Sequence, residues 1–157
     1  MKKDSVKLID KKILSSLQRD VSRSLSEISK EVNLSNTPCW NRIKKLQNRG
    51  YIKSRVALLE PKKINLGVTA FIFLSVGQHT PEELEKFVNE IEGRPEVTSF
   101  YRVSGDYDYI LKVQIESIEK YDEFSQELIG SIKFTNFTTS FCMSEIKNTT
   151  ELPLKYL

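Results

Sequence analysis

The spacing of apolar residues changes near residue 65, and this change divides the 157-residue chain into two parts. In the first part apolar residues recur every three or four positions, as at Ile9, Ile13 and Leu17, which is the spacing of one buried face on an α-helix. In the second part, runs of β-branched and aromatic residues alternate with helical patterns, as in an α+β domain. We therefore predict two small domains with separate cores.

Three successive helices fit the first part of the chain. After the first helix, Ser24 and Glu27 form a capping-box pattern at the start of a second, short helix. Ser35 can then cap a third helix, which tolerates Pro38 in its first turn. This spacing is typical of a helix-turn-helix, whose last helix enters the major groove of DNA. Residues 51–59 have strand composition and predict a small two-stranded wing.

The third predicted helix has two chemically different sides. At about 100° per residue, Cys39, Ile43 and Leu46 gather on one side, and hydrogen-bonding or cationic residues gather on the other. Asn and Thr can read base edges, whereas Lys and Arg neutralise phosphates. A solvated polar helix would show the same pattern, so that alternative stays open. With two basic residues of the wing, the predicted DNA-contacting residues are Ser35, Thr37, Trp40, Asn41, Arg42, Lys44, Lys45, Lys53 and Arg55.

Charge is divided as unevenly as the apolar pattern. Residues 1–65 contain 16 Lys and Arg against 6 Asp and Glu, a net charge of +10, whereas residues 66–157 contain 8 against 15, a net charge of −7. A basic module joined to an acidic one favours a polyanionic partner for the first part, and double-stranded DNA fits a helix-turn-helix. Lysine-rich helices that are simply solvated would give the same asymmetry.

The second part predicts a strand, a helix, two strands, a helix and a strand, with the strands at 68–76, 97–104, 109–115 and 137–146. This order is the ferredoxin-like arrangement, in which both helices cover one face of a four-stranded sheet. From Phe71 to Leu74 both alternating sets of side chains are large and apolar, so the uncovered face of a monomer would expose an apolar patch. We therefore expect at least a homodimer.

Several classes of function lack the residues that they need. No run approaches the about 18 uncharged apolar residues of a membrane helix, so we expect no membrane contact and a cytoplasmic location. Cys39 and Cys142 are the only cysteines and His79 is the only histidine, which leaves little material for a metal cluster or a His-based triad. We expect no cofactor, no metal and no enzyme activity.

Sequence segments from both parts resemble one known family. They are DKKIL at 10–14, LSNTPCWNRIKKL at 34–46, GYI at 50–52, ALLEP at 57–61 and SGDYDY at 104–109. Together and in this order they resemble the leucine-responsive (Lrp/AsnC, feast/famine) transcription regulators. The resemblance implies a winged helix-turn-helix domain at 1–59, a linker at 60–67 and a ferredoxin-like effector-binding and oligomerisation domain at 68–157. It also implies dimers that assemble further, often to octamers, and that respond to amino acids.

The same resemblance implies an effector site formed by Ser104, Gly105, Asp106, Tyr107 and Asp108 together with Thr139. Two carboxylates beside exposed backbone amides offer acceptors for an ammonium group and donors for a carboxylate, which are the two ends of a free amino acid. A Gly/Asp hairpin turn without any ligand explains the loop as well. The predicted function is therefore sequence-specific DNA binding that responds to a small effector, an amino acid by resemblance.

Two alternatives from other classes remain. Siroheme decarboxylases, which act on a tetrapyrrole, resemble the same two-domain layout, but they would need haem-ligand or proton-donor residues that are hard to find here. A four-stranded sheet with aromatic residues could also be an RNA-recognition module. Phe100, Tyr101 and Phe141 lie in the acidic part without the glycine–aromatic RNP pattern, which disfavours RNA.

Overall fold

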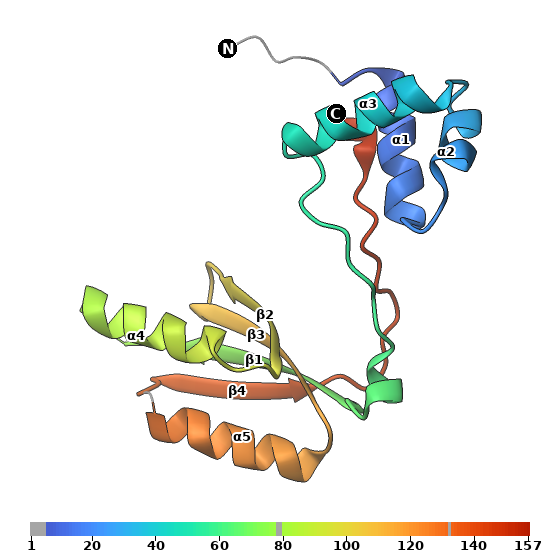
Figure 1. The fold of residues 1–157 in the computed structure, drawn as a ribbon. Coiled ribbons are helices and arrows are strands. Elements are labelled where there is room, and N and C mark those ends of the chain that lie inside the picture. Colours follow the sequence, from blue (N-terminus) through green and yellow to red (C-terminus); the bar gives the residue numbers. More distant parts are fainter. Residues whose placement is uncertain (1–5, 78–79, 132) are drawn as a thin grey trace. The chain divides into compact units, whose positions relative to one another are not determined.

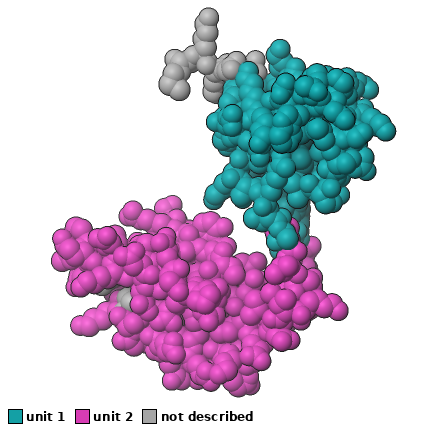
Figure 2. Space-filling model, in the orientation of Figure 1, with its two compact units in different colours: residues 1–57, 147–157 teal, residues 58–146 magenta. Residues whose placement is uncertain are grey.

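The computed structural model describes residues 6–77, 80–131 and 133–157, so His79 lies outside the described residues. The chain forms two compact units, one of residues 1–57 and 147–157 (unit 1) and one of residues 58–146 (unit 2), which Figure 2 shows in teal and magenta. Residues 147–157, which the sequence analysis assigned to the second domain, therefore group with the first; we call them the C-terminal strap. Within the described ranges, no helix is long and apolar enough to cross a membrane.

The described residues of unit 1 form three α-helices, α1 (Leu8–Arg19), α2 (Leu25–Glu31) and α3 (Asn36–Asn48) (Figure 1). The predicted capping box at the start of α2 is present, since Ser24 accepts a hydrogen bond from the amide of Glu27 and the Glu27 carboxylate accepts one from the amide of Ser24. The three helices enclose one apolar core, which consists of Ile13, Leu14, Ile28, Val32, Cys39, Ile43 and Leu46.

The segment after α3 differs from the sequence-based expectation. No strand is described in residues 51–60, where the composition predicted a wing, and the chain reaches a short 3-10 helix, η1 (Pro61–Ile64), without one. Val56, Leu58 and Leu59 are exposed. β-Propensity reflects packing on a pleated, half-buried surface, and no strand among the described residues pairs with this segment.

Unit 2 has the predicted order of elements: β1 (Val68–Ser75), α4 (Pro81–Glu92), β2 (Val97–Arg102), β3 (Tyr109–Ile115), α5 (Ile118–Ser131) and β4 (Asn136–Phe141). The strands are antiparallel neighbours in the order β2-β3-β1-β4. The predicted α+β, ferredoxin-like fold is confirmed. β4 is shorter than predicted, because its pairing with β1 ends where Phe141 meets Ala70.

The two faces of the sheet have different surroundings. Ala70, Ile72 and Leu74 of β1 are buried beneath α4 and α5, where Phe87, Ile91, Phe124 and Leu128 complete the core. The alternate residues Phe71 and Phe73 lie on the opposite, uncovered face. The strand register places Ile110 of β3 and Tyr101 of β2 on that face as well, and Tyr101 is 60% exposed. The expected apolar patch is therefore present; we call these four residues the open-face patch.

Candidate DNA-binding surface and effector site

Helix α3 turns one side to the core and one side to solvent. Cys39, Ile43 and Leu46 are buried, and burial raises the pKa of the Cys39 thiol. The hydrogen-bonding and cationic side chains of the outer side are all exposed: Thr37, Trp40, Asn41, Lys44, Lys45 and Asn48. The outer side therefore has the composition that a DNA major groove requires, donors and acceptors for base edges and cations for phosphates.

The turn that leads into α3 is fixed by backbone and side-chain contacts. Asn33 adopts a left-handed conformation (φ 55°), and the amide of Leu34 donates to the carbonyl of Ser29 (2.9 Å). The buried hydroxyl of Ser29 donates to Asn36 Oδ1 (2.7 Å). Ser35 takes the N-cap position, as predicted, but makes no side-chain capping hydrogen bond. These contacts set the direction in which α3 leaves α2.

Trp40 and Lys44 form a pair on the outer side of α3. They are four positions apart, and Lys44 Nζ lies 4.7 Å from the centre of the Trp40 ring. The Trp40 side chain is 43% exposed, so it belongs to the surface more than to the core. The pair gives this face a flat apolar surface beside a cation.

Arg42, a predicted DNA contact, is engaged inside unit 1. Its Nη1 atom donates to Asp10 Oδ1 (2.8 Å), and both side chains are partly buried. Asp10 Oδ2 also accepts a hydrogen bond from the amide of Lys7 at the N-cap of α1. Arg42 thus ties α3 to the first turn of α1, while the ammonium groups of Lys44 and Lys45 stay on the exposed side.

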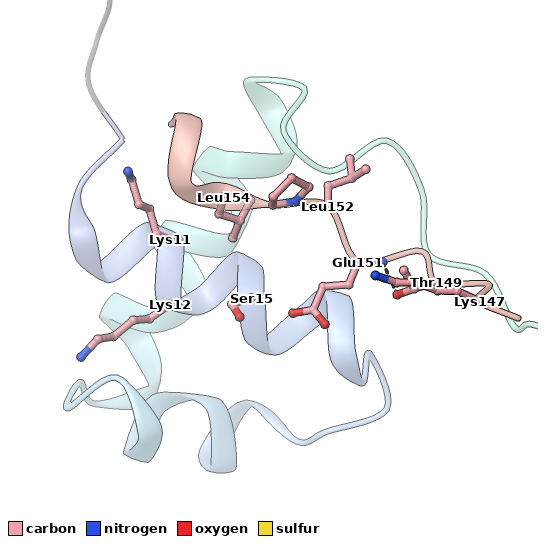
Figure 3. A pocket seen from close by; sticks show the side chains of 9 residues that line it. Lys11, Lys12, Ser15, Lys147, Thr149, Glu151, Leu152 and Leu154 are labelled. Carbon is pink, nitrogen blue, oxygen red and sulfur yellow. Dashed lines mark hydrogen bonds between the residues drawn. The ribbon is translucent and has the colours of Figure 1, made fainter.

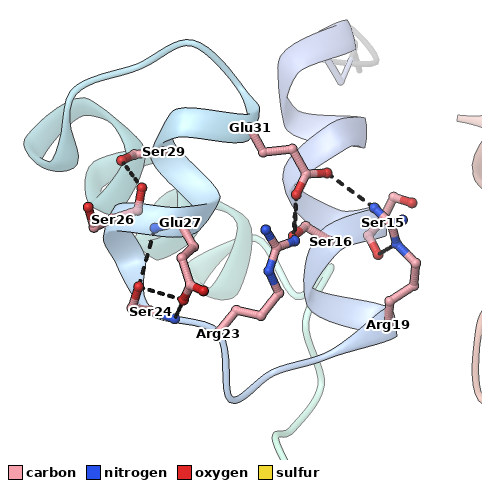
Figure 4. A network of polar contacts seen from close by, with 9 residues as sticks. All are labelled: Ser15, Ser16, Arg19, Arg23, Ser24, Ser26, Glu27, Ser29 and Glu31. Atoms are coloured by element: carbon pink, nitrogen blue, oxygen red, sulfur yellow. Dashed lines mark hydrogen bonds and ion pairs between the residues drawn. The ribbon is translucent and has the colours of Figure 1, made fainter.

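A second polar network ties α2 to α1 (Figure 4). The Glu31 carboxylate accepts hydrogen bonds from Arg19 (3.1 Å), from Arg23 and from the buried hydroxyl of Ser16 (3.2 Å). The hydrogen bond from Arg23 is the main cause that holds the pKa of Glu31 below its usual value. Ion pairs inside unit 1 therefore engage the guanidinium groups of Arg19, Arg23 and Arg42 and stabilise this unit.

Lys53 and Arg55, the predicted wing contacts, are exposed on the segment that follows α3. Near its start, the Arg49 guanidinium lies 5.2 Å from the centre of the Tyr51 ring. The segment thus continues the basic surface beyond the end of α3, although it contains no described strand.

The predicted effector hairpin is held against the end of β1. The amide of Asp108 donates to the carbonyl of Leu74 (2.9 Å), and Asp108 Oδ2 accepts from the amide of Val76 (2.9 Å). Gly105 has a φ of 141°, a conformation that other residues rarely adopt. Asp106 is exposed, and the Tyr107 ring packs against Phe73 with ring centres 5.4 Å apart. Both carboxylates are exposed, and Asp108 in addition positions the loop through the bond from the Val76 amide.

Thr139 lies on the helix-covered side of the sheet, on β4 opposite Ile72. Its hydroxyl shares a hydrogen bond with the hydroxyl of Tyr121 on α5, and burial raises the pKa of Tyr121. Among the described residues, no hydrogen bond joins Thr139 to the hairpin around Asp108. The structure therefore brings Ser104 to Asp108 together and leaves Thr139 as a separate contact of α5.

Comparison with known proteins identifies the family to which this two-domain chain belongs. Residues 69–152 match the model of the Lrp/AsnC ligand-binding domain, and residues 7–53 match a model of winged helix-turn-helix DNA-binding domains. The chain belongs to the Lrp/AsnC family. The family suggested by the sequence is thereby confirmed, and the two family models cover the two surfaces described above.

Relatives of this Lrp/AsnC protein match along almost its whole length. The DNA-binding transcriptional activator DecR of Escherichia coli is 43% identical over 148 residues, which are 94% of this chain and 97% of DecR. A crystal structure of an AsnC family transcriptional regulator from Agrobacterium tumefaciens superposes with a TM-score of 0.93 at 43% identity, over 97% of this chain and 99% of that chain. These relatives are regulators, which favours transcription regulation over the siroheme decarboxylase alternative.

A third relative was crystallised with a ligand. A transcriptional regulator of Neisseria meningitidis in complex with L-Met is 33% identical to this Lrp/AsnC chain, with a TM-score of 0.93 over 97% of this chain and 99% of that chain.

Sequence reasoning missed two contacts of this Lrp/AsnC fold, the Asp10–Arg42 ion pair and the bond from the Val76 amide to Asp108. Each contact joins residues that are 32 positions apart in the sequence, so no local sequence pattern predicts it.

Proposed function

We propose that this regulator binds specific duplex DNA in the cytoplasm, through the outer side of α3. The observation that carries the proposal is the exposed face on which Thr37 and Asn41 stand beside Lys44 and Lys45, opposite the buried side of the helix. Thr37 and Asn41 read base edges, and the two lysines bind phosphates on either side of the groove.

Selection from a random duplex library tests which residue reads sequence. Asn41→Ala removes a side chain that can pair with an adenine edge, so the preferred sequence relaxes at one position while binding to mixed-sequence DNA is unchanged. Asn89→Ala, which removes an exposed amide from α4, is the matched control and leaves the preference unchanged. A preference of the Asn41→Ala protein identical to wild type would remove Asn41 from base recognition.

We further propose that the effector is a free amino acid bound beside the 104–108 hairpin, with Thr139 at the same site through assembly of several chains. The exposed Asp106 carboxylate accepts the ammonium group, and backbone amides of the loop donate to the carboxylate. An apolar side chain is the expected class, because the rings of Phe73 and Tyr107 lie beside the loop. The Neisseria relative, crystallised with L-Met, supports an amino acid of this class.

Isothermal titration with a panel of free amino acids tests this site. We expect at least one apolar amino acid to bind, and Asp106→Asn to weaken that binding because the ammonium group loses its charged acceptor. Glu85→Gln on α4 removes the same charge from an exposed helical position and is the control. If no amino acid binds at millimolar concentration, the loop is only a turn and the protein acts without this class of effector.

The proposed assembly begins with a homodimer that buries the open-face patch, and higher assembly, to an octamer by resemblance, follows from it. Two large aromatic residues, Phe71 and Phe73, occupy the centre of a face that α4 and α5 leave uncovered. A twofold dimer presents two copies of α3, so the operator is an imperfect palindrome. An effector that binds one assembly state better than another then changes how many copies of α3 engage DNA at once.

A further inference from the structure

A groove runs along the side of α1 in unit 1 that faces away from the core (Figure 3). Its volume is about 680 Å³, and its two walls come from opposite ends of the sequence. One wall is α1 and the other is the C-terminal strap. Its polar lining consists of Lys11, Lys12 and Ser15 from α1 and of Lys147, Thr149 and Glu151 from the strap.

The strap is attached to α1 by specific contacts. The side-chain amide of Gln18 donates to the carbonyl of Leu152 (3.2 Å) and accepts from the amide of Leu152 (2.7 Å). Lys11 Nζ donates to the main-chain oxygen of Leu157, and the Leu154 side chain packs against the core of the three helices. Leu154 lies in a short 3-10 helix, η2 (Leu154–Tyr156). The groove is thus a built feature of unit 1.

The polar lining of the groove suits an anion. Lys11, Lys12 and Lys147 place three ammonium groups at the groove, beside one carboxylate on Glu151. The ammonium group of Lys11 is already hydrogen-bonded to the main-chain oxygen of Leu157, which leaves Lys12 and Lys147 to bind an anion. Neither Lys12 nor Lys147 forms an ion pair within the described part of the chain, whereas the arginines of unit 1 that stabilise it, such as Arg19, are paired with carboxylates. The hydroxyls of Ser15 and Thr149 add two donors. Ammonium and hydroxyl groups together are the usual donors to DNA phosphate oxygens.

We propose that this groove is a second DNA-contact surface, which binds backbone phosphates of duplex DNA that continues past the segment held by α3. Lys11 and Ser15, which line the groove, are each two positions from Ile13 and so lie about 200° around α1 from it, and Ile13 packs in the core with α3. The protein groove and the outer side of α3 are therefore different faces of unit 1. A short DNA duplex bound to α3 does not also contact the protein groove. The inference rests on the proposed DNA binding by α3.

This second DNA-contact surface is complete only while the C-terminal strap is attached to α1. Lys147 joins Lys11 and Lys12 only while Gln18 and Leu154 hold the strap in place. In the sequence the strap follows β4, the last strand of the effector-binding unit. A change in that unit that releases the strap therefore removes part of the DNA-contact surface without moving α3.

Salt titration of DNA binding tests the groove with the full-length protein and long mixed-sequence duplex DNA. Each phosphate contact adds about 0.9 to the slope of log affinity against log salt. For the double variant Lys12→Glu, Lys147→Glu we expect weaker binding and a slope smaller by about two. The control Lys86→Glu, Lys133→Glu makes the same change of net charge on exposed residues of unit 2 and keeps the wild-type slope.

A second variant separates the strap from the lysines themselves. Gln18→Ala keeps every charge but releases the strap at Leu152, so we expect the slope to fall by about one while circular dichroism still shows the folded helices. Wild-type slopes for both Lys12→Glu, Lys147→Glu and Gln18→Ala would overturn the inference about the groove. If the Lys44→Ala, Lys45→Ala variant still lowers the slope in that case, the proposed DNA binding by α3 is retained. If the α3 variant also has the wild-type slope, the proposed function fails as well.

Discussion

Asp10 and Arg42 form an ion pair of 2.8 Å that joins the first turn of α1 to the middle of α3. The pair holds the guanidinium of Arg42 within unit 1, so the cations that α3 presents to DNA are Lys44 and Lys45. Asp10 lies in the first turn of α1, where a carboxylate also interacts favourably with the helix dipole. One contact thus ties α1 to α3 and holds the guanidinium of Arg42 away from the DNA-facing side of α3.

Removal of this pair is expected to destabilise unit 1 and only indirectly affect DNA binding. Asp10→Ala and Arg42→Ala each lower the free energy of unfolding, and a double-mutant cycle in urea gives a coupling energy of about 1 kcal/mol, because the pair is only partly buried. Strict additivity of the two single variants would show that the ion pair contributes nothing.

Acid is expected to weaken the link between α1 and α2 through Glu31. The pKa of Glu31 is lowered in the folded state, chiefly by the hydrogen bond from Arg23, so its contribution to stability is present above the unfolded pKa of about 4.3. That contribution is lost as the pH falls through the lower, folded pKa. Thermal melts of Glu31→Gln should show a smaller loss of Tm over this range than wild type. Equal acid sensitivity of the two proteins would contradict the assignment.

The strap is expected to stabilise unit 1 through the side chain of Leu154. Leu154→Ala removes apolar area packed on the helical core and should cost about 1–2 kcal/mol. Leu152→Ala is a matched control, since that side chain is 70% exposed and the bonds to Gln18 use only its backbone. Urea unfolding measures both, and the account requires the Leu154 variant to lose clearly more stability than the Leu152 variant.

Charge on the open-face patch is expected to break the dimer. Phe73→Asp places a carboxylate at the centre of the uncovered face, where burial against a second copy would desolvate it. Ile129→Asp introduces the same group at an exposed position of α5, away from that face. Light scattering should report a smaller species for Phe73→Asp and the wild-type species for Ile129→Asp. A monomeric wild-type protein at micromolar concentration would refute the proposed dimer.

Local patterns predicted the helices and the ferredoxin-like order because capping boxes and apolar periodicity are short-range signals. Ser24 with Glu27 and the alternation from Phe71 to Leu74 both have the expected structural consequence. The contacts that sequence did not predict are long-range. Gln18 and Leu152 are 134 positions apart, and only the folded chain shows that the strap belongs to unit 1.

The candidate functional sites show the same difference between short-range patterns, which the sequence predicts, and long-range contacts, which it does not. The buried and exposed sides of α3 were predicted residue by residue, because one helix sets them. The partners of Arg42 and Asp108 were not, because each contact depends on how separate elements pack. The hydroxyl bond of Thr139 to Tyr121 has the same origin, since it requires α5 to cover β4.

The most direct test of the central claim is the salt dependence of duplex binding by the Lys44→Ala, Lys45→Ala protein, measured by fluorescence anisotropy on the selected operator. The account predicts weaker binding and a log–log slope smaller by about two, because two phosphate contacts are lost. The control Lys86→Ala, Lys133→Ala removes two exposed lysines from unit 2 and should match wild type. Wild-type affinity and slope in the α3 variant would contradict DNA binding by the outer side of α3.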